Sequence, residues 1–166
     1  MINMNHLNKE VHYKILKVSS AAFRDQQPIP SRYTCDGINI SPPLLIENIA
    51  ADAISLAIIV DDPDAPAGTW VHWIMWNIPV THHIKEASVP GLEGKNDFKV
   101  RSYRGPCPPP GGVHHYFFKV YALDCLLHLP ADTTKHQLEK AMGGHILAFG
   151  ELIGLYSRTK QKAPMG

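Results

Sequence analysis

A short, continuous run of apolar residues, AISLAIIV at 53–60, constrains the fold more than any other feature of the chain. The run is rich in Ile and Val and too short for a typical helix, so it predicts a strand buried on both faces. It is followed at once by DDPDAP, in which Pro63 and Pro66 cannot continue a sheet ladder. We therefore expect the buried strand to deliver Asp61, Asp62 and Asp64 to its exit.

Two more segments, WVHWIMWNIP at 70–79 and HHYFFKVYALD at 114–124, are typical of strands, and YKILKVSS at 13–20 alternates well enough to be a fourth. We expect the runs at 53–60, 70–78 and 114–123 to be neighbours or near-neighbours in one sheet. The segments between them are rich in turn signals, and QQPIPSRYTCDGINISPPL at 26–44 leaves no room for a helix.

The C-terminal quarter of the chain contains the one clear helix signal. Thr134 and Gln137 have the spacing of a capping box, and two glycines at 143–144 end the segment that follows. HILAFGELIGLYSR at 145–158 is interpreted as a short second helix and then a final strand. The sequence thus predicts a mostly β domain, a sandwich with one or two short C-terminal helices.

Length and charge exclude several classes of protein. The chain has 166 residues, the size of one domain, and its 16 basic and 15 acidic residues give a net charge of +1 with no basic run. This balance argues against a nucleic-acid partner. Neither a signal-peptide core nor an apolar run of membrane-spanning length is present, so we expect no membrane insertion and a cytoplasmic location. The predicted division is a flexible arm at 1–12, a single domain at 13–160 and a tail at 161–166.

The aspartates after the first strand are candidates for a binding site. Asp62 and Asp64 lie in a turn stiffened by two prolines, and the next strand carries His72. Side chains two apart on a strand share a face, so we expect Trp70, His72 and Trp76 to line up and Trp73 to point the other way. The alternative for His72 is a packed core histidine.

A proline-rich stretch supplies the other half of this candidate site. GPCPPPGG at 105–112 cannot be regular structure, and its glycines let backbone approach a ligand. In the strand that follows, His114 and Tyr116 share a face and His115 points away. A carboxylate, imidazoles, a phenol and backbone N–H groups suit an oxyanion with an attached cation. The aspartate would hold a histidine as imidazolium or meet the ammonium group of a zwitterion.

These two segments resemble motifs of the phosphatidylethanolamine-binding protein family, also called Raf-kinase-inhibitor-like proteins. The turn Asp-Pro-Asp-Ala-Pro, the strand Trp-x-His-Trp and the ending Asn-x-Pro are matched by 62–66, 70–73 and 77–79. Gly-Pro-x-Pro-Pro and Gly-x-His-Arg-Tyr are matched by 105–109 and 112–116, with His115 in place of the family arginine. The segments YTCDGINISPPL and GHILAFGELIGLYSR are similar to the bacterial branch, and the resemblance begins at about residue 13.

The resemblance implies a β-sandwich with a small anion pocket, no cofactor, and a homodimer. The pocket residues that it implies are Asp62, Trp70, His72, Gly105, Pro106, His114 and Tyr116, with Asp64, Pro66 and Cys107 in support. The implied function is non-enzymatic binding of phosphate- or carboxylate-bearing ligands such as phosphoethanolamine-like headgroups, with a kinase or protease as a possible regulated partner.

Two other functions stay open at this point. One is a hydrolase that uses Asp62 and His72 as an acid–base pair, for which Cys107, between prolines and near two histidines, is the one candidate nucleophile. The other is a metal site built from Asp62, Asp64, His72 and His114, whose ligand types suit zinc.

The cysteines predict free thiols. Cys35, Cys107 and Cys125 form no Cys-x-x-Cys pair, and their odd number in a reducing compartment favours the reduced state. We expect the loops of Cys35 and Cys107 to pack together at the mouth of the pocket.

Overall fold

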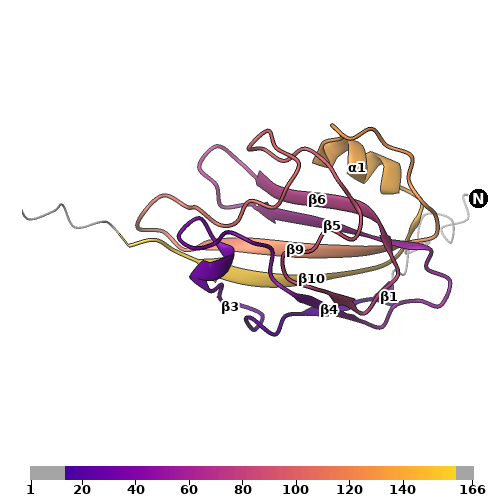
Figure 1. The fold of residues 1–166 in the computed structure, drawn as a ribbon, viewed down its shortest axis with the longest axis horizontal. Helices are drawn as coiled ribbons and strands as arrows, with labels where there is room; N and C mark the ends of the chain where they lie inside the picture. The colour runs from indigo at the N-terminus through magenta and orange to yellow at the C-terminus, as the bar shows by residue number, and fades with distance from the viewer. Residues whose placement is uncertain (1–13, 160–166) are drawn as a thin grey trace, which may run out of the picture.

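The computed structural model describes residues 14–159, so the predicted arm at 1–12 and tail at 161–166 lie outside the described residues. Two sheets face each other, with the helix on the outer side of the larger sheet (Figure 1). The large sheet has the order β1 (Lys14–Ile15), β10 (Ile146–Tyr156), β9 (His114–Leu123), β5 (Ser55–Asp62), β6 (Trp70–Pro79) and β8 (Leu92–Glu93), and β3 (Gln27–Pro28) also pairs with β10. The small sheet contains β2 (Lys17–Ser19), β4 (Leu44–Glu47) and β7 (His83–Ile84). The remaining elements within residues 14–159 are the 3₁₀ turn Ser31–Tyr33 and the helix α1, Lys135–Met142.

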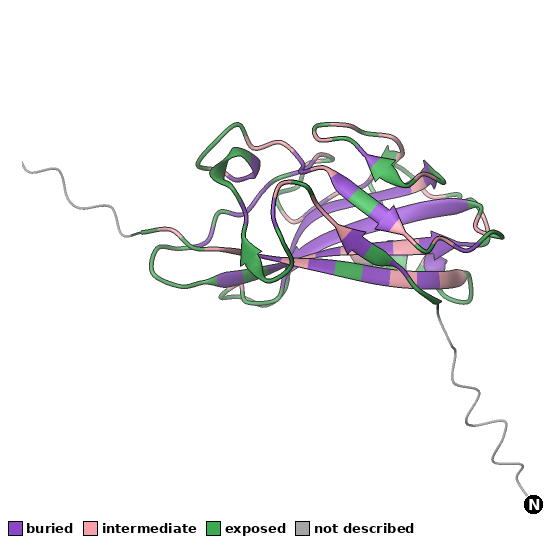
Figure 2. Ribbon diagram, turned by 90° about the horizontal axis from the view of Figure 1, so that it is seen from below, coloured by how far each residue is buried: buried purple, intermediate pink, exposed green. Residues whose placement is uncertain are grey.

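The large sheet is covered on both faces, which explains the continuous apolar run of β5. Every residue of β5 is buried, and buried residues fill the centre of the molecule (Figure 2). Alternate residues of the strand enter two different cores. Ile58 packs in the core between the two sheets, and Ile59 packs in the core under α1 with Leu138 and Met142. The expectation of a strand buried on both faces is confirmed.

The three long apolar runs are neighbours, as the sequence predicts. β5 pairs antiparallel with β6 on one side and with β9 on the other. The exit of β5, the entry of β6 and the entry of β9 therefore lie at the same end of the sheet. This arrangement brings the Asp-Pro turn and the proline-rich segment together.

The helix prediction is half right. α1 has the capping box, in which Gln137 Oε1 accepts the Thr134 N–H at 3.0 Å, and it ends at Met142 with Gly143 as the C-cap. The second short helix expected after residue 145 is wrong, because β10 occupies Ile146–Tyr156 as one continuous strand. Gly150 and Gly154 face the core at positions where a Cβ would lie 2.2 Å from the Leu16 carbonyl oxygen and 2.4 Å from Ile29, respectively. These glycines hide the alternation of the strand, because they carry no apolar side chain.

The face assignment on β6 also needs correction. The register shifts by one residue between the pairs Val60–Trp73 and Asp61–Val71, so His72 sits in a β-bulge. Beyond the bulge, Trp73 enters the core between the sheets and Trp76 the core under α1. Trp70, His72 and Trp76 therefore do not share one face, because the extra residue reverses the alternation.

The strand expected at 13–20 is divided between the two sheets. β1 pairs with β10 in the large sheet, and β2 pairs with β4 in the small sheet. Leu16, which lies between them, is buried in the core that the two sheets enclose. The chain thus crosses from one layer to the other within a few residues. Within residues 14–159, no helix has both the length and the apolar character that crossing a bilayer requires.

Candidate functional site

A cavity of about 410 Å³ opens where β5 ends and β6 and β9 begin. Five of the predicted site residues line it, namely Asp62, Trp70, His72, His114 and Tyr116, together with the predicted supports Pro66 and Cys107. The other lining residues are Ala65, Ala67, Phe98, Pro108 and Pro109. Asp62, His72, His114 and Tyr116 are buried, whereas Trp70 at the rim is 36% exposed. Polar groups thus lie at the inner end of the cavity and apolar groups at its mouth.

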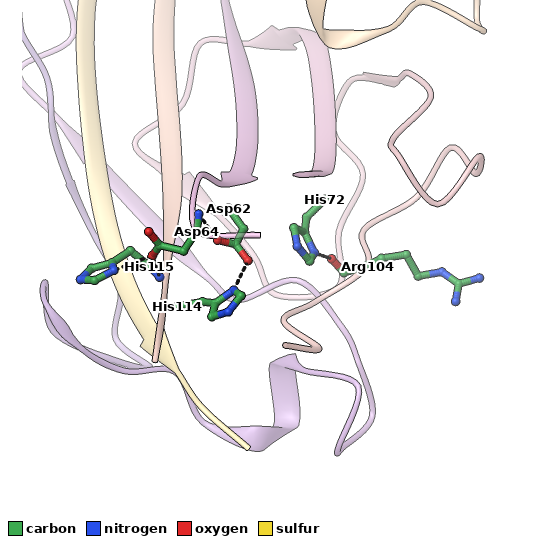
Figure 3. Close-up of polar contacts among 6 residues, drawn as sticks. All are labelled: Asp62, Asp64, His72, Arg104, His114 and His115. Atoms are coloured by element: carbon green, nitrogen blue, oxygen red, sulfur yellow. Dashed lines mark hydrogen bonds and ion pairs between the residues drawn. The ribbon is translucent and has the colours of Figure 1, made fainter. Parts of the chain in front are cut away.

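Asp62 and His114 form the central contact of the cavity (Figure 3). His114 Nδ1 lies 2.6 Å from Asp62 Oδ2, and the other carboxylate oxygen of Asp62 accepts the Asp64 N–H at 2.8 Å. A carboxylate only accepts hydrogen bonds, so Nδ1 of His114 is the donor. Its Nε2 is therefore the nitrogen left for a ligand.

His72 has a different partner from the one that the sequence suggests. Its Nδ1 lies 2.6 Å from the carbonyl oxygen of Arg104, which can only accept, so Nδ1 carries the proton. Burial lowers the pKa of His72 below the usual value, and the hydrogen bond to the carbonyl and the charge of Asp62 oppose this shift only in part. At neutral pH His72 is thus an uncharged imidazole whose Nε2 accepts a hydrogen bond.

Tyr116 completes the buried polar group. Its ring packs edge-on against His72 at a centroid distance of 5.3 Å and stacks on His114 at 6.4 Å. Burial raises the pKa of the Tyr116 hydroxyl far above its usual value, and the negative charge of Asp62 adds to the effect. The phenol therefore stays protonated, and its O–H can donate a hydrogen bond to a ligand.

Asp64 and His115 hold the turn from outside the cavity. One carboxylate oxygen of Asp64 accepts both the backbone N–H and the Nδ1–H of His115, at 2.8 and 2.7 Å. These hydrogen bonds from His115 lower the pKa of the Asp64 carboxyl. His115 points away from His114, as expected for its neighbour on a strand (Figure 3). Asp64 therefore supports the turn. His115, which stands in place of the family arginine, is its side-chain partner.

Phe98 is a lining residue that the sequence analysis missed. It packs edge-on against Trp70 at 5.5 Å and against His72 at 5.4 Å. Buried Asn96 holds its loop, because Asn96 Oδ1 accepts the Phe98 N–H at 2.9 Å and Asn96 Nδ2 donates to the His72 carbonyl at 3.1 Å. The one feature of the sequence that could have indicated Phe98 is that it is the single aromatic residue in the polar, turn-rich segment GKNDFKV.

Gly105 and Pro106 lie behind the cavity wall rather than on it. Both residues are buried, and the Gly105 N–H donates to Asn39 Oδ1 at 2.8 Å. A Cβ on Gly105 would lie 2.0 Å from the carbonyl oxygen of Tyr33. This segment packs directly against the loop at 33–39, so Gly105 is required by close packing.

The prediction of three reduced thiols is wrong. Cys35 and Cys107 form a disulfide with a Cα–Cα distance of 5.4 Å, although they are 72 positions apart. The backbone of Cys35 also donates to the Pro106 carbonyl at 3.1 Å. The two loops do pack together at the cavity, as expected, and that proximity is what lets the sulfurs join. Cys125 is the free cysteine of the chain.

The geometry bears on the two alternative functions. Asp62 pairs with His114 and His72 with a backbone carbonyl, so the Asp62–His72 pair of the hydrolase alternative is not formed. Cys107 is joined in the disulfide and offers no thiol nucleophile. No three of Asp62, Asp64, His72 and His114 are among the groups of three or more residues, within 14–159, whose ligand atoms all lie within 4.8 Å of one another.

Comparison with known proteins agrees with the architecture. The profile of the phosphatidylethanolamine-binding protein family matches residues 19–157. A UPF0098 protein of Pyrococcus abyssi is 53% identical over 155 residues, which cover 87% of this chain and 86% of that protein. A UPF0098 protein of Chlamydia muridarum is 43% identical over 150 residues, covering 86% of this chain and 99% of that one. Similar proteins thus occur in both archaea and bacteria.

Two solved structures share the fold. The crystal structure of a phosphatidylethanolamine-binding protein homologue from Chlamydia trachomatis has a TM-score of 0.83 and 39% identity, covering 87% of this chain and 99% of that one. Escherichia coli YbcL, described as a member of the mammalian PEBP family, has a TM-score of 0.80 and 26% identity, covering 86% of this chain and 98% of that one.

Proposed function

Because the chain belongs to the phosphatidylethanolamine-binding protein family, we propose that it is a non-enzymatic binding protein for small zwitterions. The ligand carries a phosphate or carboxylate group and a nearby ammonium group, as phosphoethanolamine-like headgroups do. The observation that carries this proposal is the buried Asp62–His114 pair, with its 2.6 Å hydrogen bond, inside a cavity.

The donors for the anionic group are His114 and Tyr116. His114 Nδ1 is bonded to Asp62, so Nε2 is the ring nitrogen that faces the ligand, and it donates to the anionic group in the imidazolium form that Asp62 stabilises. The Tyr116 hydroxyl keeps its proton because burial raises its pKa. Hydrogen bonds of this kind to a phosphate or carboxylate are among the stronger ones in proteins.

The acceptors for the ammonium group are Asp62 and His72. The Asp62 carboxylate retains lone pairs beyond those used by His114 and the Asp64 N–H. His72 Nε2 is an acceptor in the neutral ring, and it also suits the O–H of a singly protonated phosphate. A bare anion beside Asp62 would be repelled, whereas a zwitterion places opposite charge next to it.

The mouth of the cavity fits the apolar remainder of such a ligand. Trp70 and Phe98 pack against each other there, with Pro66 and Pro109 on the facing loops. Apolar walls with a few convergent polar groups are typical of small-molecule sites. Burial at these walls adds affinity, and the polar inner end sets the orientation of the ligand.

Calorimetric titration tests the proposal with O-phosphorylethanolamine, inorganic phosphate and ethanolamine as separate ligands. The first should bind at one site, and more tightly than either fragment. The variant His114→Asn keeps a side-chain donor for Asp62 but lacks Nε2, so it should bind O-phosphorylethanolamine about tenfold or more weakly, as expected for a lost bond to a charged group. His136→Gln, on the exposed face of α1, is the matched control. Equal affinity in the wild type and His114→Asn would refute the proposal.

The wider role is part of the same proposal and has its own assays. A kinase or protease partner and a homodimer follow from the resemblance to Raf-kinase-inhibitor-like proteins of the bacterial branch. The cytoplasmic location expected from the sequence conflicts with the Cys35–Cys107 disulfide, which a reducing compartment disfavours. Sedimentation at tens of micromolar tests the dimer, and inhibition assays test the partner. Turnover on generic esters and phosphate esters should be absent, since no thiol nucleophile faces the cavity.

A further inference from the structure

We propose that Asp124, Cys125 and His145 form a zinc-binding site, separate from the zwitterion cavity. One carboxylate oxygen, the thiol sulfur and one imidazole nitrogen of these residues all lie within 4.8 Å of one another. They are the one such group of three in residues 14–159. β9 begins at His114 in the cavity and ends at Leu123, so the cluster lies at the opposite end of this strand.

The backbone around the cluster is held on every side. The Asp124 N–H donates to the His145 carbonyl at 3.0 Å, which extends the pairing of β9 with β10 by one step. The carbonyl of Cys125 accepts the hydroxyl of buried Ser55 at 2.7 Å. The His145 N–H donates to the Met142 carbonyl at the end of α1. These bonds fix the backbone from which the three ligand side chains extend, and this lowers the cost of ordering the side chains around an ion.

The distances are close to those of a tetrahedral site. Zinc bonds of 2.0–2.3 Å place neighbouring ligand atoms about 3.3–3.8 Å apart. His145 Nδ1 and Asp124 Oδ1 are now 2.8 Å apart and share a hydrogen bond, and the sulfur lies within 4.8 Å of both partners. Zinc would replace the proton on Nδ1, and the neutral imidazole would carry its proton on Nε2 instead.

The ligand chemistry selects a borderline-soft dication. Thiolate with imidazole and carboxylate is a donor set of zinc sites, whereas calcium and magnesium take oxygen ligands. On binding, the Cys125 thiol loses its proton to solvent, so the thiolate and the carboxylate together balance the charge of the ion. Three protein ligands leave a fourth position for water.

The cluster is also accessible. The side chains of Asp124 and His145 are 44% and 46% exposed, while Cys125 is half-buried against the core under α1. An ion can therefore enter from solvent, and the sulfur lies on the drier side of the site. Since Cys35 and Cys107 are joined, Cys125 is the single thiol of the oxidised protein, and a thiolate–metal signal reports on this site alone.

Cobalt titration of the tag-free, oxidised protein tests the site. One equivalent of Co²⁺ should give a near-ultraviolet charge-transfer band from thiolate to cobalt, and one equivalent of Zn²⁺ should remove it. Zn²⁺ should also protect Cys125 from alkylation. Absence of the band in the wild type would overturn the proposal.

Variants assign the ligands. Cys125→Ser should abolish the band, and Asp124→Asn, which keeps the thiol, should weaken Zn²⁺ binding about tenfold or more. His83→Gln, exposed on the small sheet, is the matched control for the many histidines of the chain and should change nothing. A band that persists in Cys125→Ser, or Zn²⁺ affinity that is unchanged in Asp124→Asn, would contradict the site. Circular dichroism of each variant separates loss of the ligand from loss of the fold.

Discussion

His114 Nδ1 lies 2.6 Å from Asp62 Oδ2, although the two residues are 52 positions apart in the chain. The pairing of β5 with β9 sets this distance, because its register places Asp61 opposite Phe117 and brings the end of one strand to the start of the other. The carboxylate then selects the tautomer of the imidazole and leaves Nε2 for a ligand. The proposed binding function depends on this one contact more than on any other.

Replacing Asp62 by Asn should change which ligands the cavity prefers. The variant loses the negative charge that faces an ammonium group, so the affinity for O-phosphorylethanolamine should fall about tenfold or more, the equivalent of one bond to a charged group. The affinity for inorganic phosphate should fall less or rise, because the repulsion of the anion disappears. Calorimetry with both ligands measures the ratio, and a parallel loss for the two ligands would contradict the assignment of Asp62 to the ammonium group.

His72 should make the protein less stable in mild acid. Its folded-state pKa is lowered by burial, whereas in the unfolded chain it is about 6.5. Below pH 6.5, His72 is therefore protonated to a greater extent in the unfolded chain than in the folded protein. The free energy of unfolding falls as the pH decreases. His72→Asn keeps a donor for the Arg104 carbonyl and cannot titrate, so its stability should depend less steeply on pH between 7 and about 5.5. Urea unfolding across this range gives the two slopes, and identical slopes would refute the prediction.

Reducing the disulfide should loosen the cavity wall. Cys107 lines the cavity and Cys35 anchors it to the neighbouring loop. For a bridge that closes a loop with a separation of 72 residues, reduction should lower the free energy of unfolding by about 2–4 kcal/mol. Urea unfolding with and without reductant measures this difference in the free energy of unfolding. The variant Cys125→Ser should show the same difference, and Cys107→Ser should show none. A stability that does not respond to reductant in the wild type would contradict the bridge.

Gly105→Ala should disturb the same wall from the other side. The added Cβ would lie 2.0 Å from the Tyr33 carbonyl oxygen, so the backbone has to move, at a cost of about 1–3 kcal/mol. Gly112→Ala is the matched control in the same segment, because the nearest atoms to its Cβ are 4.0 Å away. Thermal unfolding of both variants checks this, and an equal effect of the two substitutions would argue against close packing at Gly105.

The parts of the fold that the sequence predicts correctly depend on local signals. Continuous or dense apolar runs indicated β5, β6 and β9, and the capping residues indicated α1. The prolines after Asp62 and after Gly105 marked the turns that bring the cavity residues together. Each of these features is determined by the residues of its own segment.

The parts that it misses depend on contacts between distant segments. The bulge at His72 exists only in the register of β6 against β5, so a simple alternation placed Trp76 on the wrong face. The alternation of β10 is hard to recognise in the sequence, because Gly150 fills a core position without an apolar side chain. The Cys35–Cys107 bridge joins two loops whose proximity no spacing in the sequence encodes. Phe98 lines the cavity because its loop is held by the hydrogen bond from the Phe98 N–H to Asn96 Oδ1.

The most direct test of the account is a long-range ¹H–¹⁵N NMR titration of the ten histidine side chains with O-phosphorylethanolamine. We expect saturable shifts of the ring nitrogens of His72 and His114, largest at Nε2, since Nδ1 of each ring stays bonded to the Arg104 carbonyl or to Asp62. The rings of His83, His136 and His145 should not shift. Shifts that do not saturate, or that are larger at these three rings than at His72 and His114, would contradict a binding site between Asp62, His72 and His114.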